Sequence, residues 1–256
     1  MRILVVNDDG IHAKGIRALA SRLAQEHDVT VVAPDSEKSA TSHSITIYRP
    51  LRIIKTEPAG LEGIRCFVVD GQPVDCTKVG VNHVMEKQVD LVVSGINHGH
   101  NMGSDIIYSG TVAAALDAVI MGYRALAVSI GSYYPQHMDV AAEVAACVIE
   151  SGLPFDSDGV LHNLNVPDLP MEQIKGIRAA RQGKLVYEDK MDVRNDPRGH
   201  QYIWMAGNLL EDETEEETDV SLLRRGYASI VPIRYDLTAG DKLDALACRI
   251  EKIKLH

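Results

Sequence analysis

The sequence predicts an α/β fold whose core is a doubly wound, mostly parallel sheet, with a β-rich extension at its C-terminal end. Two observations support this prediction. Several short runs of apolar residues end in polar residues and a glycine, and segments with apolar residues at helical spacing separate these runs. Continuous apolar runs are typical of parallel strands that are covered on both faces. The alternation of strands with helices is typical of a parallel sheet.

The predicted elements follow one another from the first residues onward. The run RILVV at 2–6 predicts the first strand. The helix after it has its apolar face at Ile16, Leu19, Ala20 and Leu23. Further strands are expected at 29–34, 66–71, 90–95 and 125–131, and further helices near 74–86, 110–122 and 139–150. Together these elements predict a Rossmann-like α/β core over residues 1–180.

The alternation of strands and helices ends near residue 175. Residues 184–207 have β-rich ends around the polar turn NDPRG, which predicts a long hairpin, and YASIVPIRYDL follows at 227–237. This part of the chain has no βαβ rhythm and no evident core of its own. We therefore interpret residues 181–256 as an extension that pairs with the main domain or with another subunit.

Length and charge exclude some functions. A chain of 256 residues can form one large α/β domain and bury a sizeable core. The net charge is -10, but seven acidic residues and no basic ones stand at 211–219, so the remainder carries only about -3. The acidity is therefore expected to belong mostly to one solvated loop. Since no basic stripe is present, we expect no nucleic-acid partner.

Cysteine usage and hydropathy point to a cytoplasmic protein. The four cysteines are scattered and form no C-x-x-C pair, which predicts buried, reduced thiols rather than a disulfide framework or a zinc site. The N-terminus lacks the basic segment and long apolar run that a signal peptide is expected to have, and no apolar run approaches the roughly 18 residues of a spanning helix. No membrane partner is expected.

The loops at the carboxyl ends of the strands carry the chemistry, because ligands bind there in open parallel sheets. These loops are expected at 7–10, 33–44, 70–75 and 94–111. The last one has eighteen residues, rich in glycine and asparagine, and a loop of that length is unusual unless it binds something. It ends in Ser109-Gly110-Thr111 directly before a predicted helix. Backbone N–H groups, hydroxyls and the helix dipole there suit an anion, above all phosphate.

Asp8 and Asp9 stand side by side at the end of the first predicted strand. Two adjacent carboxylates repel each other and are costly to bury unless a cation compensates them. Carboxylate, amide and hydroxyl oxygens are hard ligands, which suit Mg²⁺, Mn²⁺ or Ca²⁺ better than zinc or copper. A hard dication next to a helix N-terminus indicates a phosphoryl-transfer site.

Each of these residues also has a simpler interpretation. Ser109 or Thr111 can be a helix N-cap, and Asn97 and Asn101 can be turn residues. The histidines of these loops, His43, His98 and His100, are expected to form hydrogen bonds rather than to bind metal. The simpler interpretations are less convincing because all these residues are expected at the same edge of the sheet.

The main alternative to an enzyme is a non-catalytic, receiver-like or nucleotide-binding regulatory protein. Receivers also place paired acids after their first strand, and Asp70 would be the phospho-accepting residue. However, they are about half as long and have no comparable glycine- and asparagine-rich loop. The G-x-G-x-x-G, Walker A and G-x-S-x-G motifs are absent from the chain.

The motifs resemble those of the stationary-phase survival protein SurE family of metal-dependent nucleotidases. The matching stretches run in order along nearly the whole chain: ILVVNDDG, APDSEKSATSHSIT, DGQPVDC, SGINHGHNMGSDIIYSGTVAAA, NDPRGHQYIW and DVSLLRRGYASIVPIRYDLTA. The chain departs from the family pattern at Ala40, where glycine is frequent, at Gln72, where threonine is common, and at Asp117-Ala118, where Glu-Gly is usual.

The resemblance implies a SurE-like fold, a catalytic core at 1–180 and one divalent metal ion per subunit. The metal would be Mg²⁺ or Mn²⁺, with Ca²⁺ as a substitute in a crystal, held by Asp8, Asp9, Ser39 and Asn97. The phosphate would lie near Asn101, Ser109, Gly110 and Thr111. Residues 181–256 would be an oligomerisation extension that exchanges C-terminal segments in a homodimer or homotetramer.

The resemblance also implies a 5′-nucleotidase that hydrolyses nucleoside 5′-monophosphates to nucleoside and phosphate. Nucleoside 3′-monophosphates and short polyphosphate are further candidate substrates. Asp8 or Asp9 would be the catalytic residue that orients a water molecule or accepts its proton as the water attacks phosphorus in line. A covalent aspartyl-phosphate is the alternative mechanism.

Overall fold

The core of the protein is a nine-stranded, mostly parallel sheet in the order β3-β4-β2-β1-β5-β6-β7-β13-β8. The computed structural model describes residues 1–155, 158–210, 216–251 and 253. The strands of this sheet are β1 (Arg2–Val6), β2 (Asp28–Pro34), β3 (Ile53–Thr56), β4 (Arg65–Val69), β5 (Leu91–His98), β6 (Ala125–Ile130), β7 (Leu161–Val166), β8 (Ile177–Ala179) and β13 (Ala228–Ile233). Within this sheet only the β3–β4 and β7–β13 pairs are antiparallel, so the predicted fold class is confirmed.

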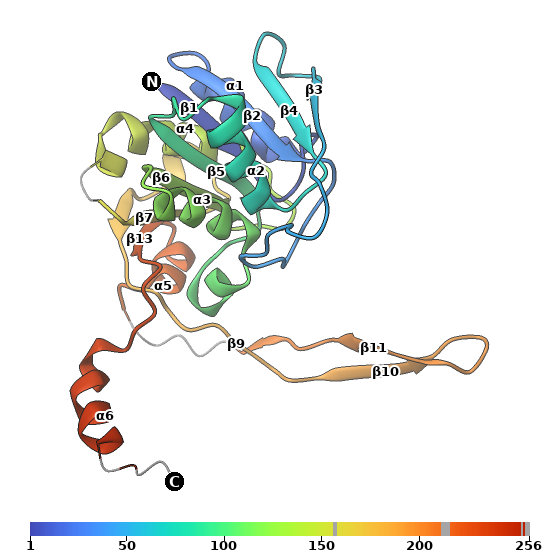
Figure 1. Ribbon diagram of the computed structural model, residues 1–256, viewed down its shortest axis with the longest axis vertical. Helices are drawn as coiled ribbons and strands as arrows, with labels where there is room; N and C mark the ends of the chain where they lie inside the picture. The colour runs from blue at the N-terminus through green and yellow to red at the C-terminus, as the bar shows by residue number, and fades with distance from the viewer. Residues whose placement is uncertain (156–157, 211–215, 252, 254–256) are drawn as a thin grey trace.

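Helices cover both faces of the sheet, as Figure 1 shows. One layer contains α1 (Lys14–Leu23) and α4 (Met138–Glu150), and the other contains α2 (Pro73–Val79) and α3 (Gly110–Ile120). Successive side chains of β1 point to opposite faces. Ile3 and Val5 therefore pack with α1 and α4, whereas Leu4 and Val6 pack with α2 and α3. This two-sided burial is the reason why the strand has a continuous apolar run.

The order of the strands places a switch point between β1 and β5. From β1 the chain continues through β2 to β4 on one side, and it then returns to β5, β6 and β7 on the other side. At such a point the loops after the two central strands diverge and leave a crevice. The segment after β1, which contains Asp8 and Asp9, and the end of β5 at Asn97 meet there.

The predicted eighteen-residue loop at 94–111 is shorter in the structure. Strand β5 continues through His98, with a register shift between Ser94 and Asn97, because Asn97 and His98 still pair with β6. A 3-10 helix, η2, then spans Gly103–Ile107 and leads into α3. The prediction of an open loop was therefore wrong for 94–98, and the remaining segment is more ordered than its glycines suggested.

The extension contains the predicted hairpin and also completes the core sheet. Strands β10 (Met191–Asn195) and β11 (Gln201–Met205) pair antiparallel around the NDPRG turn, and β9 (Val186–Tyr187) pairs with β12 (Leu209–Leu210) at their base. Helix α5 (Asp219–Arg224) precedes β13, and α6 (Leu243–Ile250) lies near the C-terminus. Figure 1 shows the hairpin and α6 standing away from the body. Strand β13, by contrast, lies between β7 and β8.

Short helical segments make up the remaining regular structure of the described residues. They are a π-helix that continues α2, η1 (Gly80–Val84), and the 3-10 helices η3 (Leu153–Phe155), η4 (Met171–Gln173) and η5 (Gly240–Lys242). The helix predicted near 74–86 thus corresponds to α2 and η1 together.

Two expectations about exposure need correction. Asp219, the last acid of the predicted solvated loop, is fully buried, whereas residues 216–217 are exposed and 211–215 lie outside the described residues. Cys66 and Cys76 are buried as expected, but Cys147 and Cys248 are exposed. Among the described residues no helix is both long and apolar enough to cross a membrane.

Candidate active site

Five of the eight predicted site residues line one cavity of about 300 Å³ at the switch point: Asp8, Ser39, Asn97, Asn101 and Ser109. Asp9 lines an adjoining cavity of about 390 Å³, which shares His98 and Tyr133 with the first. The structure thus brings together residues from four separate segments of the chain. Gly110 and Thr111 are not among the lining residues and have a different role.

Asp8 is almost completely buried, with 5% of its surface exposed. The Thr111 hydroxyl donates a hydrogen bond to its Oδ1. A Cβ added at Gly110 would lie only 2.9 Å from both Cβ and Oδ2 of Asp8. Gly110 and Thr111 therefore position the carboxylate. Burial, together with the negative charge of Asp9, raises the pKa of Asp8 to about 6.

Asp9 is held by His98 at the end of β5. Its Oδ1 lies 2.8 Å from Nδ1 of His98, and the His98 backbone N–H donates to Oδ2 at 3.4 Å. Burial raises the pKa of Asp9, although His98 acts in the opposite direction. The expectation that His98 forms hydrogen bonds is confirmed.

Ser39 and Asn97 each present a neutral oxygen to the cavity. The exposed Ser39 hydroxyl donates to the carboxylate of Glu37 at 2.6 Å. Nδ2 of Asn97 donates to the carbonyls of His98 and Gly99, at 3.2 and 2.8 Å, which leaves Oδ1 to accept from or bind to a ligand. Glu37 also lines the cavity and was missed by sequence reasoning, although an acid two residues before Ser39 was visible.

The donor set fits a hard divalent cation. It consists of two carboxylates, a hydroxyl and an amide oxygen, which are the ligand types of Mg²⁺ and Mn²⁺. Within the described part of the chain, no three His, Cys, Asp or Glu side chains gather as a metal site of their own. No lysine or arginine of the described residues forms an ion pair with Asp8. A buried carboxylate next to a second one, without a basic partner, is the electrostatic arrangement that a cation stabilises.

Asn101 is held by a buried network of amides. Its Nδ2 donates to the Ser129 hydroxyl at 2.8 Å, and its backbone N–H donates to Oδ1 of Asn165 at 2.9 Å. Its carbonyl accepts from the side-chain amides of Asn163 and Asn165, at 2.8 and 3.0 Å. These two asparagines were not predicted from the sequence, although they alternate with apolar residues in the run LHNLNV of β7.

Ser109 is the N-cap of α3, since its hydroxyl accepts from the backbone N–H of Val112 at 3.0 Å. The simpler interpretation of this residue is therefore correct for its hydroxyl oxygen. Ser109 still lines the cavity. The start of α3 thus faces the same space as Asp8, as the predicted phosphate position requires.

The base of the extension anchors the segment that follows Asn101. The carboxylate of Asp219 accepts from the backbone N–H groups of Gly103 and Gly183, at 3.0 and 2.7 Å. The Ser104 hydroxyl donates to the carbonyl of Leu185 at 2.6 Å, and the Tyr187 hydroxyl donates to Asp105, which lines the cavity. Met102, Leu185 and Val220 form a small apolar cluster beneath these contacts. The extension therefore supports the wall of the site.

The departures from the family pattern have structural consequences. Ala40 has a φ of +55°, in the left-handed region that favours glycine. Asp117 is buried, lies 3.3 Å from Nε2 of His43 and forms an ion pair with Nζ of Lys78 at 3.0 Å. It thereby ties the loop that carries Ser39 to α2 and α3. Gln72 caps α2, in a capping box with Asp75.

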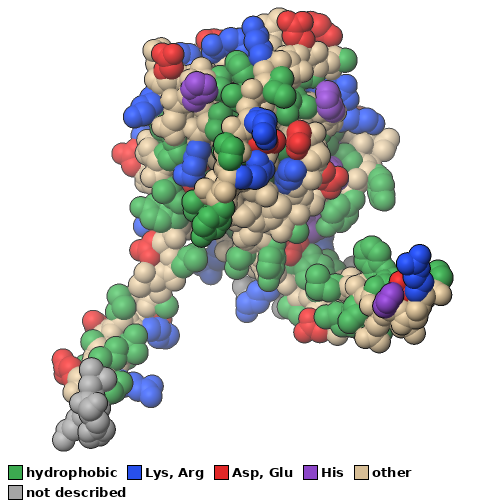
Figure 2. Space-filling model, turned by 45° about the vertical axis from the view of Figure 1, so that its right-hand side comes forward, with side chains coloured by type: hydrophobic (Ala, Val, Ile, Leu, Met, Phe, Trp, Pro, Cys, Tyr) green, Lys and Arg blue, Asp and Glu red, His purple; other side chains and the backbone are tan. Residues whose placement is uncertain are grey.

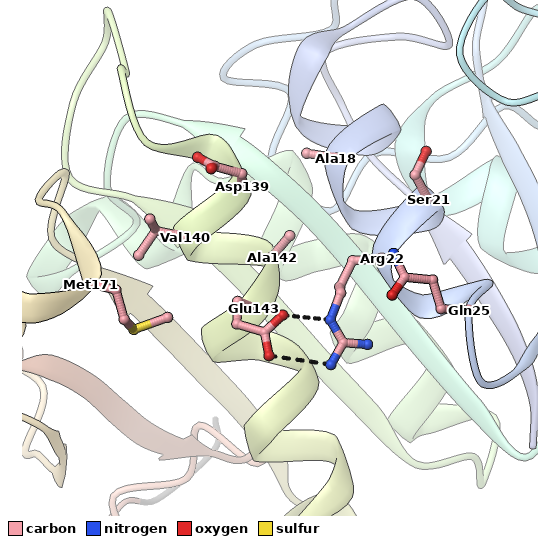
Figure 3. A pocket seen from close by; sticks show the side chains of 9 residues that line it. All are labelled: Ala18, Ser21, Arg22, Gln25, Asp139, Val140, Ala142, Glu143 and Met171. Carbon is pink, nitrogen blue, oxygen red and sulfur yellow. Dashed lines mark hydrogen bonds and ion pairs between the residues drawn. The ribbon is translucent and has the colours of Figure 1, made fainter.

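A separate hollow lies between α1 and α4 (Figure 3). Its centre is the ion pair between Arg22 and Glu143, in which Nη2 and Oε1 are 3.2 Å apart. Arg22 also pairs with Glu26 and Glu150. None of the predicted site residues lines this hollow. The ion pairs connect the two helices and account for the cluster of charges there.

The chain is similar to known proteins along nearly its whole length. The family model described as "Survival protein SurE" matches residues 3–189. Proteins named "5'-nucleotidase SurE" from Symbiobacterium thermophilum and Geobacter metallireducens are each 46% identical, over 95% and 96% of this chain and 96% of each relative. The crystal structure of the SurE protein from Aquifex aeolicus superposes with a TM-score of 0.84 at 33% identity, covering 98% of this chain and all of that one. The chain belongs to the SurE family.

Proposed function

We propose that the protein is a metal-dependent 5′-nucleotidase that hydrolyses nucleoside 5′-monophosphates. The observation that carries the proposal is the buried Asp8 carboxylate, which faces a cavity at the switch point of the sheet and has Asp9, Ser39 and Asn97 nearby. The full-length relatives named as 5′-nucleotidases support the same activity.

Asp8, Asp9, Ser39 and Asn97 would hold one Mg²⁺ or Mn²⁺ ion. When bound, such an ion supplies neutralisation of phosphate charge and a lower pKa for water. The protein's own residues orient the attacking water and bind the phosphate. Asp8 is fixed by Thr111, whereas Asp9 borders the adjoining cavity and is assigned to orient the attacking water and accept its proton. Asn101 and Ser109, at the start of α3, are assigned to bind the phosphate oxygens.

A panel of phosphate esters tests this proposal. We expect phosphate release from nucleoside 5′-monophosphates with Mn²⁺ or Mg²⁺ and none with a chelator. Nucleoside 3′-monophosphates and short polyphosphate belong in the panel because they are the further candidate substrates. Stoichiometric labelling or binding without turnover would instead indicate a regulator.

The structure disfavours the receiver-type alternative. Asp70 would have to lie beside the paired acids, but it is absent from the lining of their cavities. The carboxylate of Asp70 accepts a hydrogen bond from the backbone N–H of Arg52 at 2.7 Å and forms ion pairs with Arg49 and Arg52. These contacts lower the pKa of Asp70. Asp70 thus fixes the turn between β4 and α2 against the segment before β3.

The extension supports a proposed homodimer or homotetramer with exchanged C-terminal segments. The hairpin exposes Met191, Ile203, Trp204 and Met205, each with more than half of its surface accessible. Leu243, Leu246 and Ile250 of α6 are exposed to a similar degree. Figure 2 shows apolar side chains gathered on both projections. Apolar surface of this extent requires a partner, and a second copy of the chain is the proposed one. The cytoplasmic location stays a prediction.

A further inference from the structure

We propose that the cavity beside Asp9 receives the nucleoside half of the substrate, and that Tyr133 is the aromatic platform on which the base stacks. The inference rests on the proposed nucleotidase function and adds a subsite to it. It concerns the loop at 131–137, directly after β6, which contains none of the predicted site residues.

The two cavities are adjacent, and His98 and Tyr133 line both of them. A nucleotide whose phosphate lies beside Asp8 and Ser109 can therefore extend past this pair into the larger cavity. Tyr133 keeps 63% of its surface exposed and Tyr134, also in the lining, keeps 87%. Exposed rings beside a phosphate site match the chemistry of a nucleobase, because each base that stacks on an aromatic side chain contributes about 1–3 kcal/mol.

Tyr133 is held in place although it is exposed. Its ring packs against the backbone of Gly99, where an added Cβ would lie 2.7 Å from Cε1 of the tyrosine. It also contacts the His100 ring, with 6.2 Å between centroids and a tilt of 56°. The Gly99 N–H donates to the carbonyl of Ser132 at 2.8 Å. Gly99, with a φ of +95°, thus leaves room for the ring at this point.

The other end of the loop is anchored as well. The backbone N–H groups of Gln136 and His137 donate to Oδ1 of Asp168, at 3.0 and 2.9 Å, and Nδ1 of His137 lies 2.9 Å from the same atom. In between, the Tyr134 N–H donates to the Ser132 hydroxyl at 3.1 Å. A platform that is fixed at both ends costs little entropy to order, so stacking on it contributes nearly its full free energy to binding.

The remaining lining has the composition of a tolerant base pocket. Pro135 and Met138 supply apolar surface, and Lys14 supplies a cation. Nε2 of Gln136 donates to the carbonyl of Tyr134, which leaves Oε1 to accept from a base amino group. Stacking discriminates weakly between bases, so we expect both purine and pyrimidine nucleotides to bind, the larger purines more tightly.

Kinetics with one substrate that carries a nucleobase and one that lacks it test the subsite. In the metal-loaded protein, Tyr133→Leu should raise KM for adenosine 5′-monophosphate at least about tenfold and leave kcat within about threefold. Hydrolysis of ribose 5-phosphate, which has no base, should be unchanged, and Tyr133→Phe should restore the nucleotide KM. Tyr48→Leu is the matched control, because Tyr48 is fully exposed and lines neither cavity.

Tyr108 is the rival platform. It is 62% exposed and lines only the cavity that contains Asp8. If Tyr108→Leu rather than Tyr133→Leu selectively weakened the nucleotide, the base would lie on the opposite side and the inference would be wrong. Equal losses for both substrates in Tyr133→Leu, or no change for either, would also overturn it.

Binding of adenosine alone separates this inference from the proposed function. By calorimetry, adenosine should bind the wild type and bind Tyr133→Leu at least about tenfold more weakly, with or without metal. If the wild type hydrolysed no ester in the panel yet showed this difference, the nucleotidase proposal would fail and the base subsite would stand. If adenosine bound both proteins equally, the subsite would fail even in an active enzyme.

Discussion

Asp8 shows how a single residue can be costly to the fold and necessary for the site. The carboxylate is buried, its neighbour is a second carboxylate, and the Thr111 hydroxyl donates to its Oδ1. The raised pKa of Asp8 is a statement about stability as well as about charge. The folded state without metal binds a proton at Asp8 more tightly than the unfolded chain does.

The sign of this effect predicts the behaviour of Asp8→Asn in the presence of a chelator. The stabilising contribution of protonated Asp8 is complete below the unfolded pKa of about 4. It is lost as the pH rises through the folded value of about 6. The metal-free wild type should therefore lose stability over this range relative to Asp8→Asn. Between pH 4 and pH 8 the difference in stability should shift in favour of the variant by on the order of 1–3 kcal/mol.

Thermal melts from pH 4 to pH 8 measure this difference, and Mn²⁺ supplies the second half of the test. The metal should raise the melting temperature of the wild type much more than that of Asp8→Asn, as expected for a ligand that binds only the folded state. The metal should also raise the melting temperature of Asp9→Asn less than that of the wild type. This variant should lose activity by orders of magnitude. If the metal raised the melting temperatures of wild type and variants equally, Asp8 and Asp9 would not be metal ligands.

Ala40 predicts a second effect at the scale of one residue. Because its φ is +55°, an alanine there is strained by about 1 kcal/mol, and a β-branched side chain would be strained more. Ala40→Gly should leave the melting temperature unchanged or raise it, whereas Ala40→Val should lower it. The exposed Ala59, which is not among the residues with positive φ, provides the control. If Ala59→Val were as harmful as Ala40→Val, backbone strain at residue 40 would not be the cause.

At the scale of elements, burial decides what could be predicted. Strands β1, β2, β4, β5 and β6 were recognisable because both of their faces are covered and their runs are apolar. Strand β3 was missed, since it is a short edge strand with Ile54 and Lys55 exposed. Strand β7 was missed because Asn163 and Asn165 interrupt its apolar pattern, although both are fully buried by their contacts with Asn101.

Part of the site was also predictable, because the fold class determines where some of its residues lie. In a mostly parallel sheet the carboxyl ends of the strands share one edge, so the fold class predicts that Asp8 and Asn97 lie at the same edge. That their strands, β1 and β5, are direct neighbours is seen in the structure. The anchoring of Gly103 by Asp219 did not follow from the fold class, because it joins segments more than a hundred residues apart. No local pattern reports such a contact, and an acidic stretch predicts solvent exposure instead.

Helix α5 therefore carries a prediction of its own. In Asp219→Asn, one side-chain oxygen can no longer accept, so the backbone N–H of Gly103 or Gly183 loses its partner. We expect the free energy of unfolding to fall by about 1–3 kcal/mol, and KM to rise as the wall at 103–105 loosens. Urea titration and steady-state kinetics measure the two effects. Ser221→Ala in the same helix should change neither, and a normal KM in Asp219→Asn would separate α5 from the site.

At the scale of the whole molecule, the two projections predict the oligomeric state. A chain ending at Tyr235 keeps β13 in the sheet and removes α6, so the body should still fold while the assembly becomes smaller. Replacing 189–206 by a short turn removes the hairpin in the same way. Light scattering gives the mass of each variant, and circular dichroism confirms that the body is folded. An unchanged mass in both would refute the proposed exchange.

The position of β13 also has a consequence for the nascent chain. Residues are made from the N-terminus, and all strands from β1 to β7 have emerged well before β13. Until then the outer edge of β7 has no neighbour, and β8 cannot join the sheet, because β13 pairs with both. An unpaired edge is a template for pairing with other chains. Chains that stop before residue 228 should therefore aggregate on the ribosome or soon after release. Strand β13, the last strand of the sheet to be synthesised, covers the edge of β7 and brings β8 into the sheet.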